Sequence, residues 1–323
     1  MTAPAVSATL ATSVENLLEA MDRLPSQGNV ALRVLWMADD PMTSLADLAR
    51  AVQADPVLVA RLLHLANSAF YSPRTAIGTV DRAITLLGFA TVRTMATVVA
   101  CGLGSGAAVP QGFWQHASAT ANAAQLIAWR FGIPAGDAFT VGLLHDLGRG
   151  LLHVADPVQS AEIDLALQRE DEHEELGRLH PDPGHDPERP HELHEQPGWS
   201  NGALSHPVPV GGVDRLALER QHFGITHAEA AARVMGSWRF PTAMIEAVAR
   251  HHELPTGGPS ATTDLTRLLM SAEAVAERAF GPWGEPIERR AGIELLAIEP
   301  ERLDAVVQRV RAESGTLAAV LER

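Results

Sequence analysis

The sequence is poor in several residue types, and each shortage excludes a class of protein. It has one cysteine, Cys101, so it cannot form an internal disulfide and it suits a reducing compartment. Aromatic residues make up only 5% of the chain, and the apolar set is mainly Ala, Leu and Val, which favours helices over strands. No run of about 18 apolar residues occurs, so no membrane-spanning helix is predicted.

Basic residues are also scarce. The 25 Lys and Arg are outnumbered by 39 Asp and Glu, which gives a formal net charge of −14. An acidic surface repels phosphate backbones, so we do not expect nucleic acid as a partner, whereas a small phosphorylated ligand stays compatible if a metal supplies positive charge. Residues 1–12 contain no Lys or Arg and no sustained apolar block, which indicates a leader rather than a signal peptide. We therefore expect a cytoplasmic protein.

The sequence is rich in apolar residues at helical spacing, bracketed by capping signals. Hydrophobic residues make up 46% of the chain, enough for a buried core. Ser44 and Asp47 resemble a capping box, and Asp55-Pro56 is typical of a helix start. We expect an all-α fold without strands. The expected helices begin at 45 and at 56, cover 80–88, 89–100, 113–131 and about 137–154, and continue from 213 to the C-terminus, with a break at 254–260 and a last pair restarting at Pro300.

The composition divides the chain into four parts. Residues 1–22 are a leader and first helix, 23–106 an N-terminal helical subdomain, 107–285 a second helical subdomain, and 286–323 the C-terminal helices. An insertion at about 170–213 is rich in Glu, Asp, His and Pro, which is typical of a solvated loop. Its histidines are irregularly spaced, so a solvated tract is preferred over a weak metal-collecting segment. They are His173, His180, His185, His191 and His194.

The sharpest local feature is the segment Gly142-Leu-Leu-His145-Asp146-Leu-Gly148-Arg149. An Asp within an apolar helix is costly to bury without a partner. Imidazole nitrogen and carboxylate oxygen together suit a borderline or hard divalent cation. The alternative is a structural His–Asp pair joined by a hydrogen bond. Arg149 is a candidate for contacting phosphate, and the alternative is an exposed helix residue.

Further candidate ligands lie on the inward edges of other expected helices. One histidine stands at the first helical position after the Thr226–Glu229 capping box, where the helix dipole favours the neutral imidazole that a metal needs. Two adjacent histidines end the apolar face of a later helix, and a glutamate borders another. Each has an ordinary alternative, such as a hydrogen-bonded core histidine or a solvated flank, but together they favour one shared polar pocket. The candidate set is His116, His145, Asp146, His227, His251, His252 and Glu273.

Residues from Leu24 to about Arg278 resemble the HDOD domain, a branch of the HD superfamily. The motifs that carry the resemblance are Leu24-Pro25, Asp40-Pro41, Asp55-Pro56, Leu63 through Ala66-Asn67-Ser68-Ala69-Phe70-Tyr71, Ala83-Ile84, Leu86-Leu87-Gly88, Val92-Arg93, Phe113-Trp114, His116, His145-Asp146, Phe223-Gly224, His227-Ala228-Glu229, Trp238, Pro241 and His251-His252. Two departures stand out. The insertion is longer than expected, and Glu273 occupies the place of an Asp in related HD proteins.

The resemblance implies an N-terminal helical subdomain packed on an HD-like helical bundle. It also implies an output or adaptor role in bacterial signalling, often without catalysis. HD enzymes use the matching His and Asp positions to hold one or two divalent metals, which here would be iron, manganese, zinc or magnesium. The metal activates water for attack on a phosphate ester. The related cyclic-dinucleotide phosphodiesterases carry Gly-Tyr-Pro after their His-His-Glu, and its absence after Glu253 speaks against cyclic-di-GMP hydrolysis.

Three functions follow, in decreasing order of support. The first is a non-catalytic signalling module that binds a partner protein or a small ligand. The second is a metal-dependent phosphohydrolase that uses the seven candidate residues. The third is a DNA-binding regulator, because residues Ser44 to Leu63 are expected to form a capped helix, a short break and a second helix, as in a helix-turn-helix. Its second helix offers no polar or basic side chains near its start for reading bases, so core packing is preferred for this pair.

Overall fold

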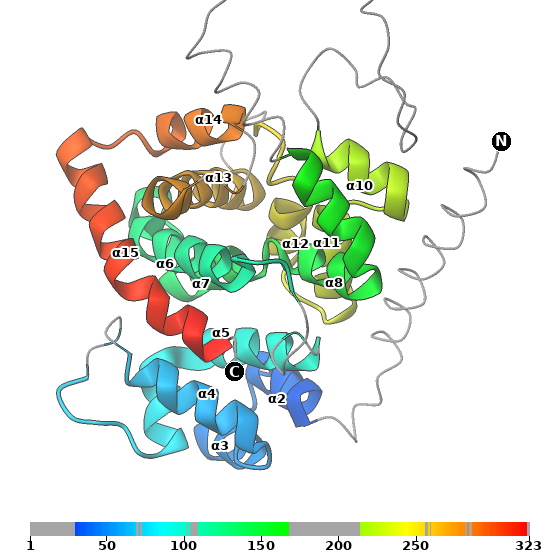
Figure 1. The fold of residues 1–323 in the computed structure, drawn as a ribbon. Helices are drawn as coiled ribbons and strands as arrows, with labels where there is room; N and C mark the ends of the chain where they lie inside the picture. Colours follow the sequence, from blue (N-terminus) through cyan, green and yellow to red (C-terminus); the bar gives the residue numbers. More distant parts are fainter. Residues whose placement is uncertain are drawn as a thin grey trace, which may run out of the picture.

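The computed structural model describes residues 30–68, 71, 73–101, 103, 109–167, 214–255, 258, 260–281, 283 and 286–321. Within these ranges all regular secondary structure is helical, so the expected all-α fold is confirmed (Figure 1). The leader at 1–22 and the insertion at about 170–213, with its five histidines, lie outside the described residues. The expected division into four parts stays a prediction.

The N-terminal helices form one layer, at the bottom of Figure 1. They are α2 (Val30–Asp39), α3 (Leu45–Val52), α4 (Pro56–Ala66) and α5 (Val80–Ala100). The caps expected from the sequence are present, because Ser44 accepts from the Asp47 amide and Asp55 Oδ1 accepts from the Leu58 amide over 3.1 Å. Leu58 is fully buried, as core packing of the α3–α4 pair requires.

Helix α5 bends where the sequence predicts a helix end. Gly88 has φ 80° and ψ 160°, a conformation that L-residues rarely adopt, so the two expected helices join across a kink at this glycine. Among the described residues α5 is the one helix long and apolar enough to cross a membrane, but 67% of its apolar window is buried. It therefore has the burial of a core helix in a soluble protein.

The second layer is built around two long helices, α6 (Phe113–Phe131) and α13 (Ala261–Phe280), and the shorter α7 (Ala135–Leu144). Helices α8 (Leu147–Ala155), α10 (Arg215–Phe223), α11 (His227–Ser237) and α12 (Thr242–Ala249) pack at one side of them (Figure 1). One expected helix, from about 137 to 154, is in fact two. The break falls at His145-Asp146, and its cause is described below.

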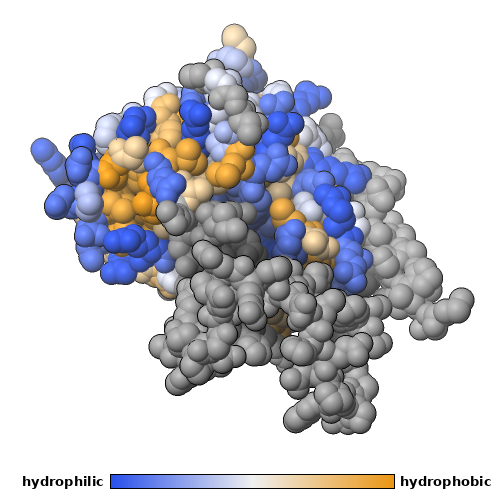
Figure 2. Space-filling view, turned by 90° about the horizontal axis from the view of Figure 1, so that it is seen from above, coloured by the Kyte–Doolittle hydropathy of each residue, from blue (hydrophilic) through white to orange (hydrophobic). Residues whose placement is uncertain are grey.

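The C-terminal helices connect the two layers. Helix α14 (Pro286–Leu296) packs on α13, and α15 (Pro300–Leu321) runs down the side of the molecule against α6, α13 and α4 (Figure 1). The expectation of a pair of helices after Pro300 is wrong, because α15 is continuous from Pro300 to Leu321. Its inward face includes Leu303, Val307 and Val310, as expected. On the face opposite α4, the coloured part of the surface is a mixture of hydrophilic areas and an apolar area on the side of α13 to α15 (Figure 2).

Candidate metal centre

The structure brings all seven candidate ligands into one cluster at the centre of the second layer. His116 comes from the first turn of α6, His227 opens α11, and Glu273 lies midway along α13. The other four come from the α7–α8 junction and from the turn after α12. Three overlapping groups each have their ligand atoms within 4.8 Å of one another: His116, His145 and Glu273; His145, Asp146 and His251; and His227, His251 and His252.

The break between α7 and α8 allows the side chains of two consecutive residues, His145 and Asp146, to point toward this cluster. Asp146 has φ −93° and ψ 10°, outside the helical range, and the His145 Nδ1 donates to the Gly142 carbonyl over 2.8 Å. In a continuous helix neighbouring side chains diverge by about 100°. A Cβ added at Gly148 would lie 1.9 Å from the His227 carbonyl oxygen, so only glycine lets α8 approach α11 this closely. The break between α7 and α8 and the contact of Gly148 with α11 therefore bring His145, Asp146 and His227 close to one another.

One half of the cluster gathers around His145. Its Nε2 lies 3.2 Å from the Nε2 of His116 and 3.2 Å from Oε1 of Glu273. The Oδ2 of Asp146 lies 3.7 Å from the His145 Nε2 and 3.9 Å from the His116 Nε2. Two imidazoles and two carboxylates therefore face one point.

The other half gathers around His227. Its Nε2 lies 2.8 Å from the Nε2 of His252 and 3.3 Å from Oδ1 of Asp146. The His251 Nε2 lies 3.8 Å from Asp146 Oδ1 and 3.8 Å from Glu273 Oε1. Asp146 thus directs one carboxylate oxygen toward each half, which gives the two halves a shared residue.

Outer hydrogen bonds fix the direction of three imidazole rings. The Nδ1 atoms of His145 and His251 donate to backbone carbonyls on their own segments, and the Nδ1 of His227 donates to Glu219 Oε2 over 2.7 Å. A neutral imidazole carries one proton, so when these rings are neutral, as a metal ligand must be, each Nε2 presents a lone pair to the cluster. Glu219, on α10, also accepts from the His227 amide over 2.8 Å. The sequence analysis missed Glu219, and nothing in its sequence neighbourhood marks it as buried.

The centre is buried, and burial shifts most of its titrations. Burial, reinforced by neighbouring histidines, lowers the pKa of His116 and His251 well below the ordinary value and that of His252 to about 3. Burial also lowers the pKa of His145, but Asp146 and Glu273 outweigh it and raise the value to about 9. In Asp146, burial is outweighed by His145 and Arg149, which lower the pKa well below the usual range. Most of these rings are therefore neutral at pH 7.

Two further residues cover Asp146. The Arg149 Nη1 lies 3.3 Å from Asp146 Oδ2, and its Nη2 lies 3.4 Å from Asp164 Oδ1. This side chain is therefore buried in ion pairs, and the alternative of an exposed helix residue is wrong. Trp283, in the segment after α13, donates from Nε1 to Asp146 Oδ2 over 2.8 Å. Its ring stacks on His116, and the Arg149 guanidinium lies 4.1 Å from its centre. The sequence analysis did not identify Trp283 as part of the site.

The donor set fits a divalent metal. The His251 Nε2 is buried without a hydrogen-bond partner, although an unsatisfied buried nitrogen is costly. In the first half, the Nε2 atoms of His116 and His145 face each other across 3.2 Å. A cation between such nitrogens would satisfy them, and imidazole with carboxylate is the donor mixture that zinc, iron and manganese accept.

The family of the chain can be stated at this point. Residues 24–186 and 204–254 match the family model of the HDOD domain. The chain belongs to the HDOD family. The match covers α2 to α12 and so includes every candidate histidine, but it ends before Glu273 and Trp283. No curated protein matches the sequence.

Solved structures share this HDOD fold. A Shewanella amazonensis SB2B protein, provisionally named a phosphohydrolase, has 22% identity and a TM-score of 0.65, covering 96% of this chain and 98% of its own. A second protein from that organism, provisionally named a metal-dependent phosphohydrolase, has 18% identity and a TM-score of 0.53, covering 98% and 100%. A Marinobacter aquaeolei VT8 protein, provisionally named a signal transduction protein, has 20% identity and a TM-score of 0.62, covering 98% of this chain and 66% of its own. Likeness at these identities concerns the fold.

Proposed function

We propose that this HDOD protein is a cytoplasmic bacterial signalling module that acts by binding a partner protein or a small ligand rather than by turnover. The observation that carries the proposal is the cover over Asp146. Trp283 and Arg149 already bind the Oδ2 atom, which is the oxygen nearest to His116 and His145. A phosphate ester would have to displace both side chains before it could reach that half of the centre.

The centre itself we assign to one or two divalent ions. His116, His145 and Glu273 would hold one, His227, His251 and His252 the other, and Asp146 would contribute an oxygen to each. A bound divalent ion supplies Lewis-acid polarisation of water or phosphate, and it also joins the helices that carry its ligands. Because Trp283 and Arg149 cover the centre, we propose that the ion joins the helices rather than activating a substrate. Ligands from α6, α11 and α13 meet at this centre. The exposed apolar area of Figure 2 offers a surface for a protein partner.

Elemental analysis combined with a phosphodiesterase assay tests the proposal. Protein purified without a nickel column is compared with the His145→Ala/Asp146→Ala double variant, and bis(p-nitrophenyl) phosphate serves as the substrate. We expect about one or two equivalents of iron, manganese or zinc in the wild type and loss of metal in the double variant. We expect no hydrolysis by the wild type above the level of the double variant. Metal-dependent hydrolysis that the double variant abolishes would overturn the non-catalytic proposal.

A second function, metal-dependent phosphohydrolase, is favoured by one specific observation. The donor set is complete, with five histidines and two carboxylates, and three of the histidines are oriented by outer hydrogen bonds. The Shewanella protein with the provisional name of metal-dependent phosphohydrolase has the same fold. For this function Arg149 is the phosphate contact. A screen of phosphate monoesters and diesters with added manganese and iron distinguishes the two functions, because only the enzyme produces free phosphate that increases with time.

A further inference from the structure

Two arginines converge on one carboxylate oxygen beside the metal centre. The Nη2 of Arg149, from α8, lies 3.4 Å from Oδ1 of Asp164, and the Nη2 of Arg215, the first residue of α10, lies 2.6 Å from the same oxygen. Asp164 belongs to the helical residues 157–167, which follow α8. Neither Asp164 nor Arg215 is a candidate metal ligand, so this contact needs an explanation of its own.

The two guanidinium groups are buried, and their like charges lie close together. The exposed fraction of the side chain is 6% for Arg149 and 13% for Arg215. Each also lies near a second carboxylate, because Arg149 Nη1 is 3.3 Å from Asp146 Oδ2 and Arg215 Nη1 is 3.8 Å from Glu219 Oε1. Both of those carboxylates are engaged elsewhere, since Asp146 faces the histidines of the centre and Glu219 accepts from His227. Buried charges without a partner are costly, so the position between the arginines favours an anion.

Asp164 fills this position only in part. A guanidinium group has several N–H donors, but both arginines use a single oxygen of Asp164. The Arg149 Nε is buried and has no hydrogen-bond partner among the described residues. Asp164 has the most exposed side chain of the three, at 26%. The arginines therefore form the floor of a site, and the carboxylate lies on its solvent side, where a ligand from solution can replace it.

We propose that Arg149 and Arg215 form a binding site for the phosphate group of a small phosphorylated ligand, and that Asp164 occupies this site while the ligand is absent. A phosphate monoester carries roughly −1.5 to −2 charges at pH 7 and has more acceptor oxygens than a carboxylate, which carries a single charge. Guanidinium groups bind phosphate oxygens through paired N–H donors. A phosphate therefore matches two adjacent arginines better than Asp164 does.

The site lies on the outer side of the cover over Asp146. Arg149 uses different nitrogens for Asp164 and for Asp146, so a phosphate that replaces Asp164 leaves the Arg149 Nη1 beside Asp146 Oδ2. The ligand can thus bind without entering the metal centre, and the shared arginine connects the two sites. The inference rests on the proposed function, since it names the class of small ligand that the signalling module binds.

Calorimetric titration of the full chain with inorganic phosphate tests the proposal. We expect Asp164→Asn to bind phosphate at least about tenfold more tightly than the wild type, because the competing charge is lost, and Arg215→Gln to bind it at least about tenfold more weakly. Acetate, as a carboxylate probe, should bind more weakly than phosphate to each of these proteins. Unchanged phosphate affinity in Asp164→Asn, or tighter binding of acetate than of phosphate, would contradict the assignment.

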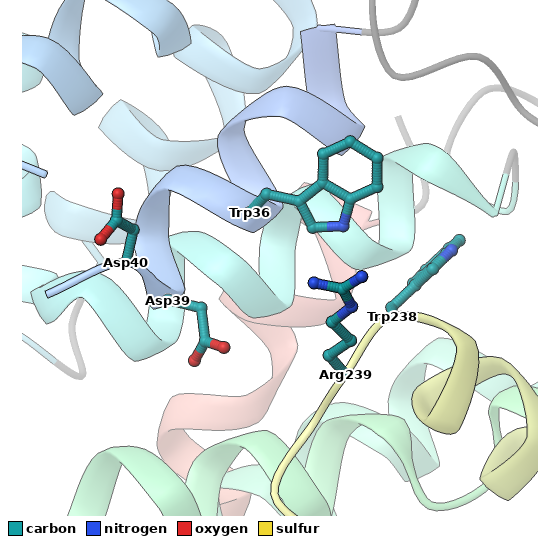
Figure 3. A pocket seen from close by; sticks show the side chains of 5 residues that line it. All are labelled: Trp36, Asp39, Asp40, Trp238 and Arg239. Atoms are coloured by element: carbon teal, nitrogen blue, oxygen red, sulfur yellow. The ribbon is translucent and has the colours of Figure 1, made fainter. Parts of the chain in front are cut away.

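Two control variants remove the same charges elsewhere. Glu162→Gln removes an exposed carboxylate from the same helical segment, where it accepts from the Gln159 side chain over 3.1 Å. Arg239→Gln removes an exposed arginine from the turn between α11 and α12, where it lines a pocket together with Asp39 and Asp40 (Figure 3). The carboxylates of that pocket repel phosphate, so we expect both variants to bind phosphate as the wild type does.

Thermal unfolding separates a binding site from a purely structural ion pair. Asp164→Asn leaves two buried arginines without the anion between them, so we expect a lower unfolding temperature than that of the wild type in phosphate-free buffer. Added phosphate should then raise the unfolding temperature of this variant more than that of the wild type. A loss of stability that phosphate does not reverse would give Asp164 a structural role only and refute the proposal.

The metal itself is the other place where phosphate can bind. Phosphate binding that is unaffected by Asp164→Asn but lost in the His145→Ala/Asp146→Ala variant would place the anion on the metal and would also refute the proposal. Inorganic phosphate is not hydrolysed, so these titrations report on the arginine site whether or not the centre is catalytic. A failure of this inference is therefore distinct from a failure of the proposed function, which the phosphodiesterase assay tests.

Discussion

The indole N–H of Trp283 donates to Asp146 Oδ2 over 2.8 Å, while the same ring lies almost parallel to the imidazole of His116, at 13° and with centroids 5.0 Å apart. The two bonded residues are 137 positions apart in the sequence. Trp283 follows α13, and its backbone amide donates to Glu277 of that helix over 3.0 Å. The side chain that covers the centre is therefore anchored to a helix that also supplies Glu273. Opening this side of the centre requires movement of two side chains, Trp283 and Arg149, rather than of a domain.

Removal of the Trp283 side chain should speed the exchange of bound metal. In Trp283→Ala the indole no longer covers His116 and Asp146, so we expect a chelator to remove metal at least about tenfold faster, with little change in metal content at equilibrium. Trp283→Phe keeps the stacking ring but loses the N–H donor, and it should give an intermediate rate. Stopped-flow release to a chromogenic chelator measures both. Trp129→Ala is the control, and equal release rates in all four proteins would show that Trp283 is not a cover.

Glu219 should be needed for metal affinity although it is not a ligand. It accepts from both the Nδ1 and the amide of His227 and so holds that ring toward the centre. In Glu219→Gln the charge that supports the ring is lost, and we expect metal affinity to fall roughly 10–100-fold, as for other outer partners of metal-bound histidines. Competition with a chelator of known affinity measures the change. Glu301→Gln, in the first turn of α15, is the matched control. An affinity equal to that of the wild type would restrict Glu219 to a purely structural role.

Sequence reasoning identified local features whose signals are short in range. The capping box of Thr226 and Glu229 and the full extent of α6 were predicted because a cap or an apolar stripe lies within a few residues of the element that it defines. The seven candidate ligands could be selected because polar residues on apolar faces are conspicuous. That they share one polar pocket was predicted from their places on the inward edges of several helices, and the structure brings their ligand atoms together.

The missed features are long in range or depend on close packing. Trp283 reaches Asp146 from the segment after α13, and Glu219 is buried only because α10 packs beside the start of α11. The break at His145-Asp146 has no Pro or cap signal, since it results from side-chain contacts within the centre and from the contact of Gly148 with α11. Apolar periodicity runs through such a break, so the pattern predicted one helix.

The stability of the metal-free protein should be greatest near pH 6.5. His116, His251 and His252 have lowered pKa values in the folded protein. Below about pH 6.5 the unfolded chain therefore binds more protons than the folded protein does, and the free energy of unfolding decreases as the pH is lowered. His145 has a pKa raised to about 9, so its contribution is present below pH 6.5 and is lost as the pH rises toward 9. Urea unfolding of chelator-treated protein from pH 5 to 9 measures both limbs. A His145→Gln variant should lose the alkaline limb, and a flat profile for the wild type would contradict these directions.

Gly148→Ala should be among the most damaging single-methyl changes in the chain. The added Cβ would lie 1.9 Å from the His227 carbonyl oxygen, and the neighbouring atoms are backbone, so no side chain can rotate away. Helix α8 must then move away from α11. The distance between Asp146 Oδ1 and His227 Nε2, now 3.3 Å, should therefore increase. We expect a loss of roughly 3 kcal/mol or more in unfolding free energy, together with weaker metal binding.

The matched control for this change is Gly236→Ala, on α11, the helix that α8 contacts through Gly148. A Cβ there meets nothing within 4 Å, so alanine should stabilise the helix by roughly 0.5–1 kcal/mol. The same substitution is thus expected to act with opposite signs at two positions. Chemical denaturation and metal titration of both variants decide the matter. If Gly148→Ala unfolds like the wild type and retains its metal, the α8–α11 contact does not position Asp146 and His227, and the geometry of the centre must be set by α6, α12 and α13 alone.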